Sequence, residues 1–146
     1  MKVPAAVLFS LLLSVPSWAV LGQPEQSVTS DQKRLRGELR STTGQGYTVH
    51  EIDAPDGMIV KEYAAPGGMV FGVSWRGPTM PDLQNLLGSY FPEFRQSAAN
   101  AGPHHRVLAV RTARLVVESS GHMRSFRGRA YVASLLPANI TEEVIQ

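Results

Sequence analysis

The stretch that decides the fold is residues 47–75, YTVHEIDAPDGMIVKEYAAPGGMVFGVSW. Three runs rich in β-branched and aromatic residues, YTVHEI, MIVKEYA and MVFGVSW, are separated by two turn-forming sequences, DAPDG and APGG. Asp56-Gly57 between two such runs is a strong signal for a hairpin. In the third run every second residue is large and apolar, a period that places these side chains on one face of a strand, toward the core. The segment predicts a three-stranded antiparallel meander whose last strand buries Met69, Phe71, Val73 and Trp75.

An amphipathic helix is predicted after the meander. Thr79-Met80-Pro81-Asp82 matches a capping box that begins at Thr79, and proline is accepted in the first turn of a helix. Pro92 is expected either to kink this helix or to begin a second short one. Apolar residues recur along the helix at intervals of three and four, which forms one continuous apolar face. They are Leu83, Leu86, Leu87, Tyr90, Phe91 and Phe94.

Residues 107–132 predict a second hairpin, in which RLVVES and MRSFRGRAYV flank a turn at Ser119-Ser120-Gly121-His122. Strands, a helix and then strands with short connections indicate an α+β fold. We therefore expect a single antiparallel sheet, made of the β-meander and the C-terminal hairpin, with one main helix packed on one face. This α+β domain covers residues 47–136, and residues 137–146 form a C-terminal tail.

Residues 20–46 are expected to form a mobile or loosely packed lead-in to this domain. Their sequence is polar and rich in turn residues, and STTGQG at 41–46 has the composition of a flexible joint. Within the lead-in, Gln32 to Leu39 would form a short helix that uses Leu35 and Leu39 as its apolar contacts.

Residues 1–19, MKVPAAVLFSLLLSVPSWA, have the pattern of a secretory signal peptide. A positive residue, Lys2, precedes a short apolar run, and small residues at positions 17 and 19 mark a cleavage site. The run is shorter than the roughly 20 apolar residues that a membrane span needs. We therefore expect cleavage after Ala19, a periplasmic or secreted location, and no stable membrane insertion of the mature protein.

The composition limits the function classes that fit the chain. There is no cysteine, so the exported domain must be held together by its hydrophobic core without disulfides. Lys and Arg total 14 against 12 Asp and Glu, the formal net charge is +2, and there is no polybasic run. This near balance gives no strong electrostatic case for binding nucleic acid or an anionic membrane.

Residues 127–134, RGRAYVAS, follow much of the RNA-binding signature K/R-G-F/Y-G/A-F-V-x-F/Y. The third position of that signature is an aromatic residue that stacks on a base. Here the third position is Arg129, and Ser134 stands where the last aromatic residue belongs. We therefore predict that this stretch is a strand of the hairpin and that nucleic acid is not a partner.

The arginines of this strand support two interpretations. Alternation places Arg127 and Arg129 on the same face, where guanidinium groups can bind carboxylates or phosphates. They can equally pair with acidic residues of neighbouring strands, and we favour this interpretation because opposite charges across strands ordinarily stabilise sheets. The acidic candidates are Glu51, Glu62 and Glu118.

No motif of the chain supports catalysis or a cofactor. Ser120 with His122 is a weak candidate for a nucleophile and its base, which must lie within hydrogen-bond reach of each other. None of the four histidines has the tight spacing of metal ligands, so no metal is predicted. A metal site assembled in space from three or four ligands is the remaining alternative. The histidines are His50, His104, His105 and His122.

Two stretches, YTVHEIDAPDGMIVKEYAAPGGMVFGVSWRGPTMPDLQNLLG and SGHMRSFRGRAYVASLLP, together with the export signal, give the chain a family likeness. It resembles an exported bacterial family known as domain of unknown function 2844. The resemblance covers nearly all of the chain beyond residue 46. It implies a Gram-negative proteobacterial origin and a periplasmic or secreted location, and it assigns no activity, ligand or catalytic residue.

The leading hypothesis for the function is a non-catalytic exported domain that binds a partner protein or a small ligand in the envelope. Trp, Tyr and Arg dominate binding hot spots. The best candidates for a contact surface are therefore Trp75, Arg76, Tyr90, Arg124, Arg127 and Arg129, although a place in the core is the favoured alternative for Trp75 and Tyr90. The rival hypothesis is a small hydrolase or metal-binding protein that uses His50 and His122 with a carboxylate.

Overall fold

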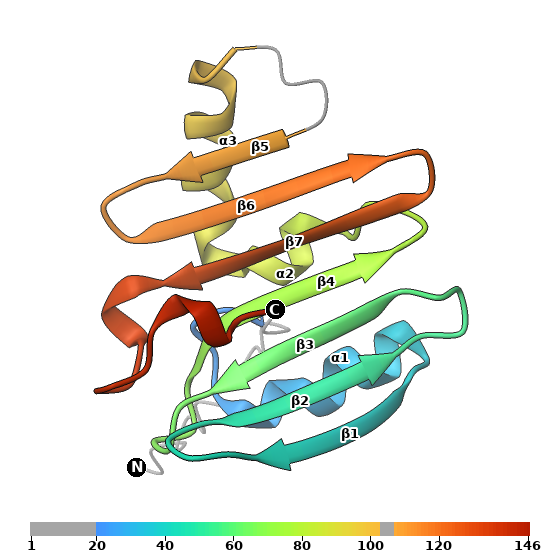
Figure 1. Cartoon of the computed structure of the whole chain (residues 1–146), viewed down its shortest axis with the longest axis vertical. Coiled ribbons are helices and arrows are strands. Elements are labelled where there is room, and N and C mark those ends of the chain that lie inside the picture. Colours follow the sequence, from blue (N-terminus) through green and yellow to red (C-terminus); the bar gives the residue numbers. More distant parts are fainter. Residues whose placement is uncertain (1–19, 103–106) are drawn as a thin grey trace, which may run out of the picture.

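The structure, a computed structural model, describes residues 20–102 and 107–146. The predicted signal peptide, together with His104 and His105, lies outside these residues. The described residues form one antiparallel sheet of seven strands in the order β1-β2-β3-β4-β7-β6-β5, with three α-helices (Figure 1). The strands are β1 (Glu38–Thr43), β2 (Thr48–Asp53), β3 (Ile59–Ala64), β4 (Val70–Gly77), β5 (Val107–Arg111), β6 (Leu115–His122) and β7 (Ser125–Val132), and the helices are α1 (Val28–Leu35), α2 (Leu83–Leu87) and α3 (Phe91–Asn100).

The predicted meander is present as β2, β3 and β4, which pair antiparallel in chain order. As predicted, Asp56 and Gly57 lie in the turn between β2 and β3. Gly57 has a φ of 85°, in the left-handed region that glycine enters at little cost, and the Asp56 carboxylate accepts a hydrogen bond of 3.0 Å from the Met58 N–H. These local contacts reverse the chain and fix the register of the hairpin.

The predicted alternation of β4 is wrong at Phe71. The register between β3 and β4 shifts at this point, and Phe71 is left without a partner in β3. Its side chain therefore packs on the face opposite to that of Val73 and Trp75, as the extra residue of a β-bulge does. Met69, which was expected in the core, is 37% exposed.

Residues 20–46 are not a loosely packed lead-in, contrary to the prediction. Val20 and Leu21 are fully buried, and the residues after them pair with the start of β4 through backbone hydrogen bonds. The short helix predicted here is α1, but it ends at Leu35 because Arg36 takes a left-handed conformation with a φ of 53°. The chain then continues as the edge strand β1, in place of the end of the predicted helix and the predicted joint.

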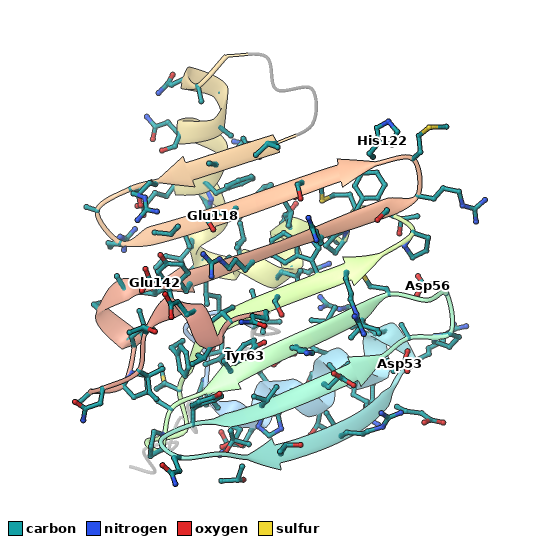
Figure 2. All side chains as sticks on the ribbon, viewed as in Figure 1. Asp53, Asp56, Tyr63, Glu118, His122 and Glu142 are labelled. Carbon is teal, nitrogen blue, oxygen red and sulfur yellow. The ribbon has the colours of Figure 1, made fainter. Side chains whose placement is uncertain are left out.

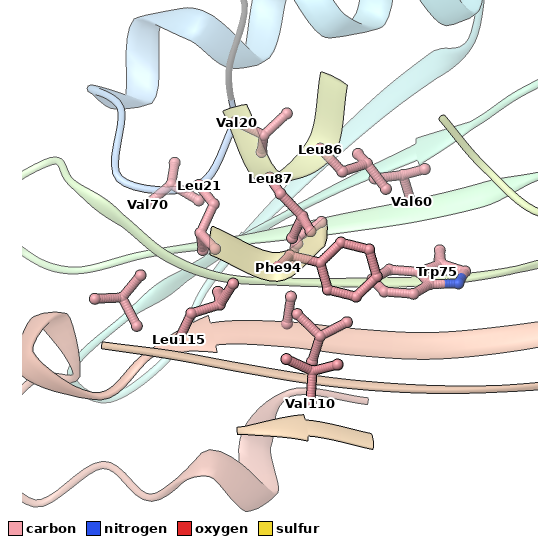
Figure 3. Close-up of a cluster of buried hydrophobic side chains, with 14 of the residues drawn as sticks. Val20, Leu21, Val60, Val70, Trp75, Leu86, Leu87, Phe94, Val110 and Leu115 are labelled. Carbon is pink, nitrogen blue, oxygen red and sulfur yellow. The ribbon is translucent and has the colours of Figure 1, made fainter. Parts of the chain in front are cut away.

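The helical segment predicted after the meander is two helices, α2 and α3, joined by the 3₁₀ turn η2 (Gly88–Tyr90), in agreement with the alternative that Pro92 begins a second helix. Pro92 lies in the first turn of α3, so it begins a second helix and does not kink the first. Helix α2 is capped by Asp82, whose carboxylate accepts a hydrogen bond from the Asn85 N–H, and not by Thr79 as predicted. The apolar residues predicted for the helical face all belong to the main hydrophobic cluster or pack against it (Figure 3).

The C-terminal hairpin is present as β6 and β7, but its turn is not where the sequence predicted it. Ser119 to His122 are the last residues of β6, and the chain reverses at Met123 and Arg124, whose φ angles are 39° and 64°. Two-residue hairpin loops normally contain Asn or Gly. Met123 and Arg124 are neither, so the sequence pattern favoured a turn at the preceding Ser-Ser-Gly-His residues. Strand β7 also pairs with β4, which joins the hairpin and the meander in one sheet.

The two faces of the sheet are covered differently. The back face carries Val73 and Val117 and packs against α2, α3 and residues 20–21 in the main hydrophobic cluster (Figure 3). The front face, toward the viewer in Figure 1, carries Phe71 and Tyr131 and packs against the segment that follows β7.

Residues 137–146, predicted as a tail, cover part of the front face. Ile145 is 1% exposed and lies against Gly72, where a Cβ atom would come within 2.6 Å of the Ile145 Cδ1 atom. The hydroxyl groups of Tyr63 and Ser74 both donate to the Gln146 carbonyl oxygen, at 2.8 and 2.9 Å. This C-terminal segment is therefore part of the domain, and it borders the region of the front face that stays open.

Candidate functional site

The open region of the front face is hollowed into a cavity of about 700 Å³. The C-terminal residues Ile145 and Gln146 form one border, and Figure 2 shows Glu118 and Tyr63 on either side of this C-terminal segment. Cavities of this size ordinarily admit small molecules. Five strands send alternate residues toward the cavity: Ile59 and Lys61 from β3, Ser74 and Arg76 from β4, Arg127 and Arg129 from β7, Glu118 and Ser120 from β6, and Val107 and Ala109 from β5.

Strand register sets one row of side chains across the cavity. Arg76 of β4 lies directly opposite Arg127 of β7. Ile59 continues the row on the β3 side, and Ser120 and then Val107 continue it on the β5 side. Residues directly opposite each other in antiparallel strands have Cβ atoms about 5 Å apart. Two guanidinium side chains are thus neighbours in this row, whose cavity-lining part runs from Ile59 to Val107; beyond Ile59 the row continues with Asp53 of β2.

In the next row the cations already have partners. Arg129 Nε donates a hydrogen bond of 2.9 Å to the Glu118 carboxylate, and Arg129 Nη1 donates to the Glu142 carbonyl oxygen at 3.0 Å. Lys61 Nζ lies 3.7 Å from the Glu51 carboxylate. The predicted pairing of strand arginines with acidic neighbours is therefore confirmed for Arg129.

Arg76 and Arg127 differ from Arg129, because neither makes a hydrogen bond or an ion pair within residues 20–102 and 107–146. Both side chains are exposed. Glu62, one of the acidic candidates for pairing, lies on the back face beside Val73 and cannot reach them. Like charges directly opposite each other destabilise a sheet. The unliganded domain therefore carries an unfavourable cation pair whose N–H donors suit carboxylate or phosphate oxygens.

The other candidates for the contact surface lie elsewhere. Although Trp75 borders the cavity, its side chain is 3% exposed and belongs to the back-face cluster. Tyr90 packs against the same cluster and has the Arg114 guanidinium carbon 5.4 Å from its ring centre. Arg124 lies at the tip of the hairpin between β6 and β7. The structure brings together only Arg76, Arg127 and Arg129 of the six predicted residues.

The histidines considered for a metal or catalytic site do not converge. His50 is buried on the back face, where Nε2 lies 2.5 Å from a Glu25 carboxylate oxygen and Nδ1 lies 2.7 Å from the Ser41 hydroxyl. His122 ends β6 on the front face, and within the described residues it makes no hydrogen bond with Ser120. A joint site of His50 and His122 is therefore not formed. In the described ranges no group of three or more His, Cys, Asp or Glu side chains is placed to hold a metal ion.

Glu62, which the sequence suggested only as an acidic partner for the strand arginines, is a buried carboxyl group. It is fully buried, and neither of its carboxylate oxygens has a hydrogen-bond partner in the described part of the chain. Burial, and then the negative charge of Asp31, raise the pKa of Glu62 to about 8, while the Arg34 charge lowers it. Its position between Val60 and Ala64 in an alternating strand was the available signal, because that position points to the back face.

The fold and the cavity define a class of protein: a small α+β domain on one antiparallel sheet, with a cation pair in a cavity on its front face. Residues 17–145 match the family described as Protein of unknown function (DUF2844), and the chain belongs to this family. The family resemblance of the sequence is thereby confirmed. No curated protein and no solved structure matches the chain. None of the helices in the described residues is long and apolar enough to cross a membrane.

Proposed function

We propose that the protein is an exported, non-catalytic binding module of the bacterial envelope, periplasmic or secreted, that holds an anionic ligand in its front-face cavity. The observation that carries the proposal is the cross-strand pair of Arg76 and Arg127, which lies in a cavity and has no acidic partner among the described residues. The export part of the proposal rests on the signal-peptide pattern of residues 1–19.

An anion between the two guanidinium groups would remove the repulsion that the pair carries. Each guanidinium group has five N–H donors and stays charged at every physiological pH. An oxyanion that bridges them accepts charge-assisted hydrogen bonds, which are roughly twice as strong as neutral ones. Arg129 is already held by Glu118 and Glu142, so binding is expected to depend on Arg76 and Arg127.

Replacing Arg76 and Arg127 together with alanine is expected to weaken the binding of inorganic phosphate at least about 10-fold, because each hydrogen bond to a charged group contributes about 1.5–3 kcal/mol. The measurement is an NMR titration of residues 20–146 with phosphate that follows the backbone amide signals of β4 and β7, which the variant retains. Arg124→Ala is the matched control, since Arg124 is exposed at a hairpin tip outside the cavity, and it should leave the affinity unchanged. Equal affinities of the double variant and the wild type would contradict the proposal.

Expression of the full chain in a Gram-negative host is expected to release a protein that begins at Val20, because the residues before it have the small-residue pattern of a signal-peptidase site. The intact mass of the protein recovered by osmotic shock or from the medium measures this. Ala19→Arg, which places a charge at the last position before the cut, should leave the chain uncleaved. An uncleaved wild-type chain in the cytoplasm would refute the export part of the proposal and leave the binding part to its own test.

A further inference from the structure

We infer that the ligand of the front-face cavity is an amphipathic anion, in which one phosphate or carboxylate head is carried on one apolar chain. The inference rests on the proposed function, because it takes the pair of Arg76 and Arg127 as the site of the head. It adds what the rest of the cavity recognises. Two features of the cavity carry it: where the unpaired cations lie, and where apolar side chains are exposed.

The unpaired cations that line the cavity lie side by side at one point. Lys61 and Arg129, the other cations that line it, form ion pairs with Glu51 and Glu118, which also lie within ion-pair distance of Arg40 and Arg111. Arg76 and Arg127 lie opposite each other, line the cavity and are exposed. A single head with two or three oxygens can bridge the pair, whereas a second anionic group would find no unpaired cation among the described residues that line the cavity.

Apolar side chains continue the row on both sides of the cation pair. Val107 is 65% exposed although it lines the cavity, and Ala109 is exposed next to it on β5. Ile59 lies at the other end of the cavity-lining part of the row, beside Arg76. Val107 is two strands away from Arg127, or about 10 Å at the ordinary spacing of strands. An apolar chain attached to the head can therefore cover the exposed valine, and this burial is favourable.

An uncharged residue, Ser120, lies between Arg127 and Val107 in the row. Glu118 lies in the neighbouring row, opposite Ala109 in β5 and Arg129 in β7, and its carboxylate is paired with both Arg129 and Arg111. An uncharged chain that runs from the cation pair over Ser120 to Val107 therefore meets no unpaired charge among the described residues that line the cavity. The cavity has a volume of about 700 Å³ and is bordered by the C-terminal segment. A cavity of this size and shape fits one free molecule and not a bilayer surface.

The test compares three probes by isothermal titration against residues 20–146: octyl phosphate below its micelle concentration, inorganic phosphate, and octyl glucoside. Octyl phosphate is expected to bind at least about 10-fold more tightly than inorganic phosphate, and octyl glucoside should not bind, since it has the chain without the charge. Val107→Ser should weaken octyl phosphate severalfold and leave inorganic phosphate unchanged. Its matched control is Met123→Ser, which removes a side chain that is 83% exposed and outside the cavity.

The outcomes separate this inference from the proposed function. If both phosphates bind equally, or if Val107→Ser changes neither, the apolar part of the ligand is refuted while the anion site stands. If neither phosphate binds the wild type, both the proposed anion site and this inference are refuted. Vesicles of phosphatidylglycerol, with phosphatidylcholine vesicles as the neutral control, form the last arm. Binding to the anionic vesicles that octyl phosphate competes away and that the double alanine variant of Arg76 and Arg127 loses would assign the head to a membrane lipid and overturn the single-molecule form.

Discussion

Glu62→Gln is expected to make the domain much more stable than the wild type at about pH 8 and equally stable at about pH 4. In the unfolded chain this carboxyl group titrates near its ordinary pKa of 4.5, whereas in the folded domain its pKa is about 8. Between these values the folded state binds more protons than the unfolded state, so the stability of the wild type falls as the pH rises. At about 1.4 kcal/mol per pKa unit, the loss is on the order of 5 kcal/mol and is complete above about pH 8. Glutamine has the same shape and no proton to lose.

The measurement is urea denaturation of the wild type and the variant at several pH values between 4 and 8. Glu38→Gln is the control, because Glu38 is exposed on the edge strand β1, and it should keep the wild-type profile. Burial also raises the pKa of Asp31 in α1, so the Glu62 variant should keep a weaker dependence of the same sign. If the stability of the Glu62 variant falls in parallel with that of the wild type, another group is responsible and the burial of Glu62 is not its cause.

The sequence predicts the elements of the fold where local signals act. Asp56 and Gly57 specify the turn between β2 and β3, since the contacts that reverse the chain lie within a few residues. The apolar stripe in residues 83–94 identifies the helical residues that pack in the main cluster, because neighbouring residues on one helix face share their environment. The break at η2 interrupts the helix without interrupting this stripe, so Pro92, and not the apolar pattern, was the signal for a second helix.

Long-range packing determines the parts that the sequence did not predict. Val20 and Ile145 belong to apolar pairs, Val20-Leu21 and Val144-Ile145, that are too short to show a period, and they are buried because strands far away in the chain surround them. The bulge at Phe71 is a property of a strand pair, since one extra residue is visible only against the register of β3. Short segments of this kind carry no periodicity that would reveal their partners.

The candidate site was predicted only in part, because it too depends on residues that are brought together from distant strands. Alternation within β7 places Arg127 and Arg129 on one face, as the structure shows. Which of them is free depends on the residues opposite, and these come from β4 and β6. The register places Glu118 beside Arg129 but places Arg76 beside Arg127. The favoured pairing with acidic residues was therefore correct for one arginine and wrong for the other.

Gly128→Ala is expected to destabilise the domain by about 3 kcal/mol, at the upper end of the cost of overpacking a core. A Cβ atom at this position would lie 2.4 Å from Trp75 Cζ2 and 2.6 Å from the Glu118 carbonyl oxygen. The first neighbour is an indole ring that is 3% exposed, and the second is the backbone of β6, so neither can move aside alone. Thermal unfolding measures the effect, and a fall of roughly 10 °C is expected.

Two comparisons decide whether this contact is the cause. Gly67→Ala places a Cβ in open space in the turn before β4, and it should change the stability by less than about 0.5 kcal/mol. Trp75→Phe removes the part of the indole ring that crosses Gly128, so Gly128→Ala should cost clearly less in that background. An equal cost in both backgrounds would show that the glycine is needed for another reason.

The two arginines beside Gly128 would also shift if β7 moves, so Gly128→Ala should weaken phosphate binding at Arg127 as well. The glycine that makes RGRAYV resemble an RNA-binding strand is then explained by the indole ring packed behind it, and the unpaired Arg127 beside it is the residue that the proposed anion site would use.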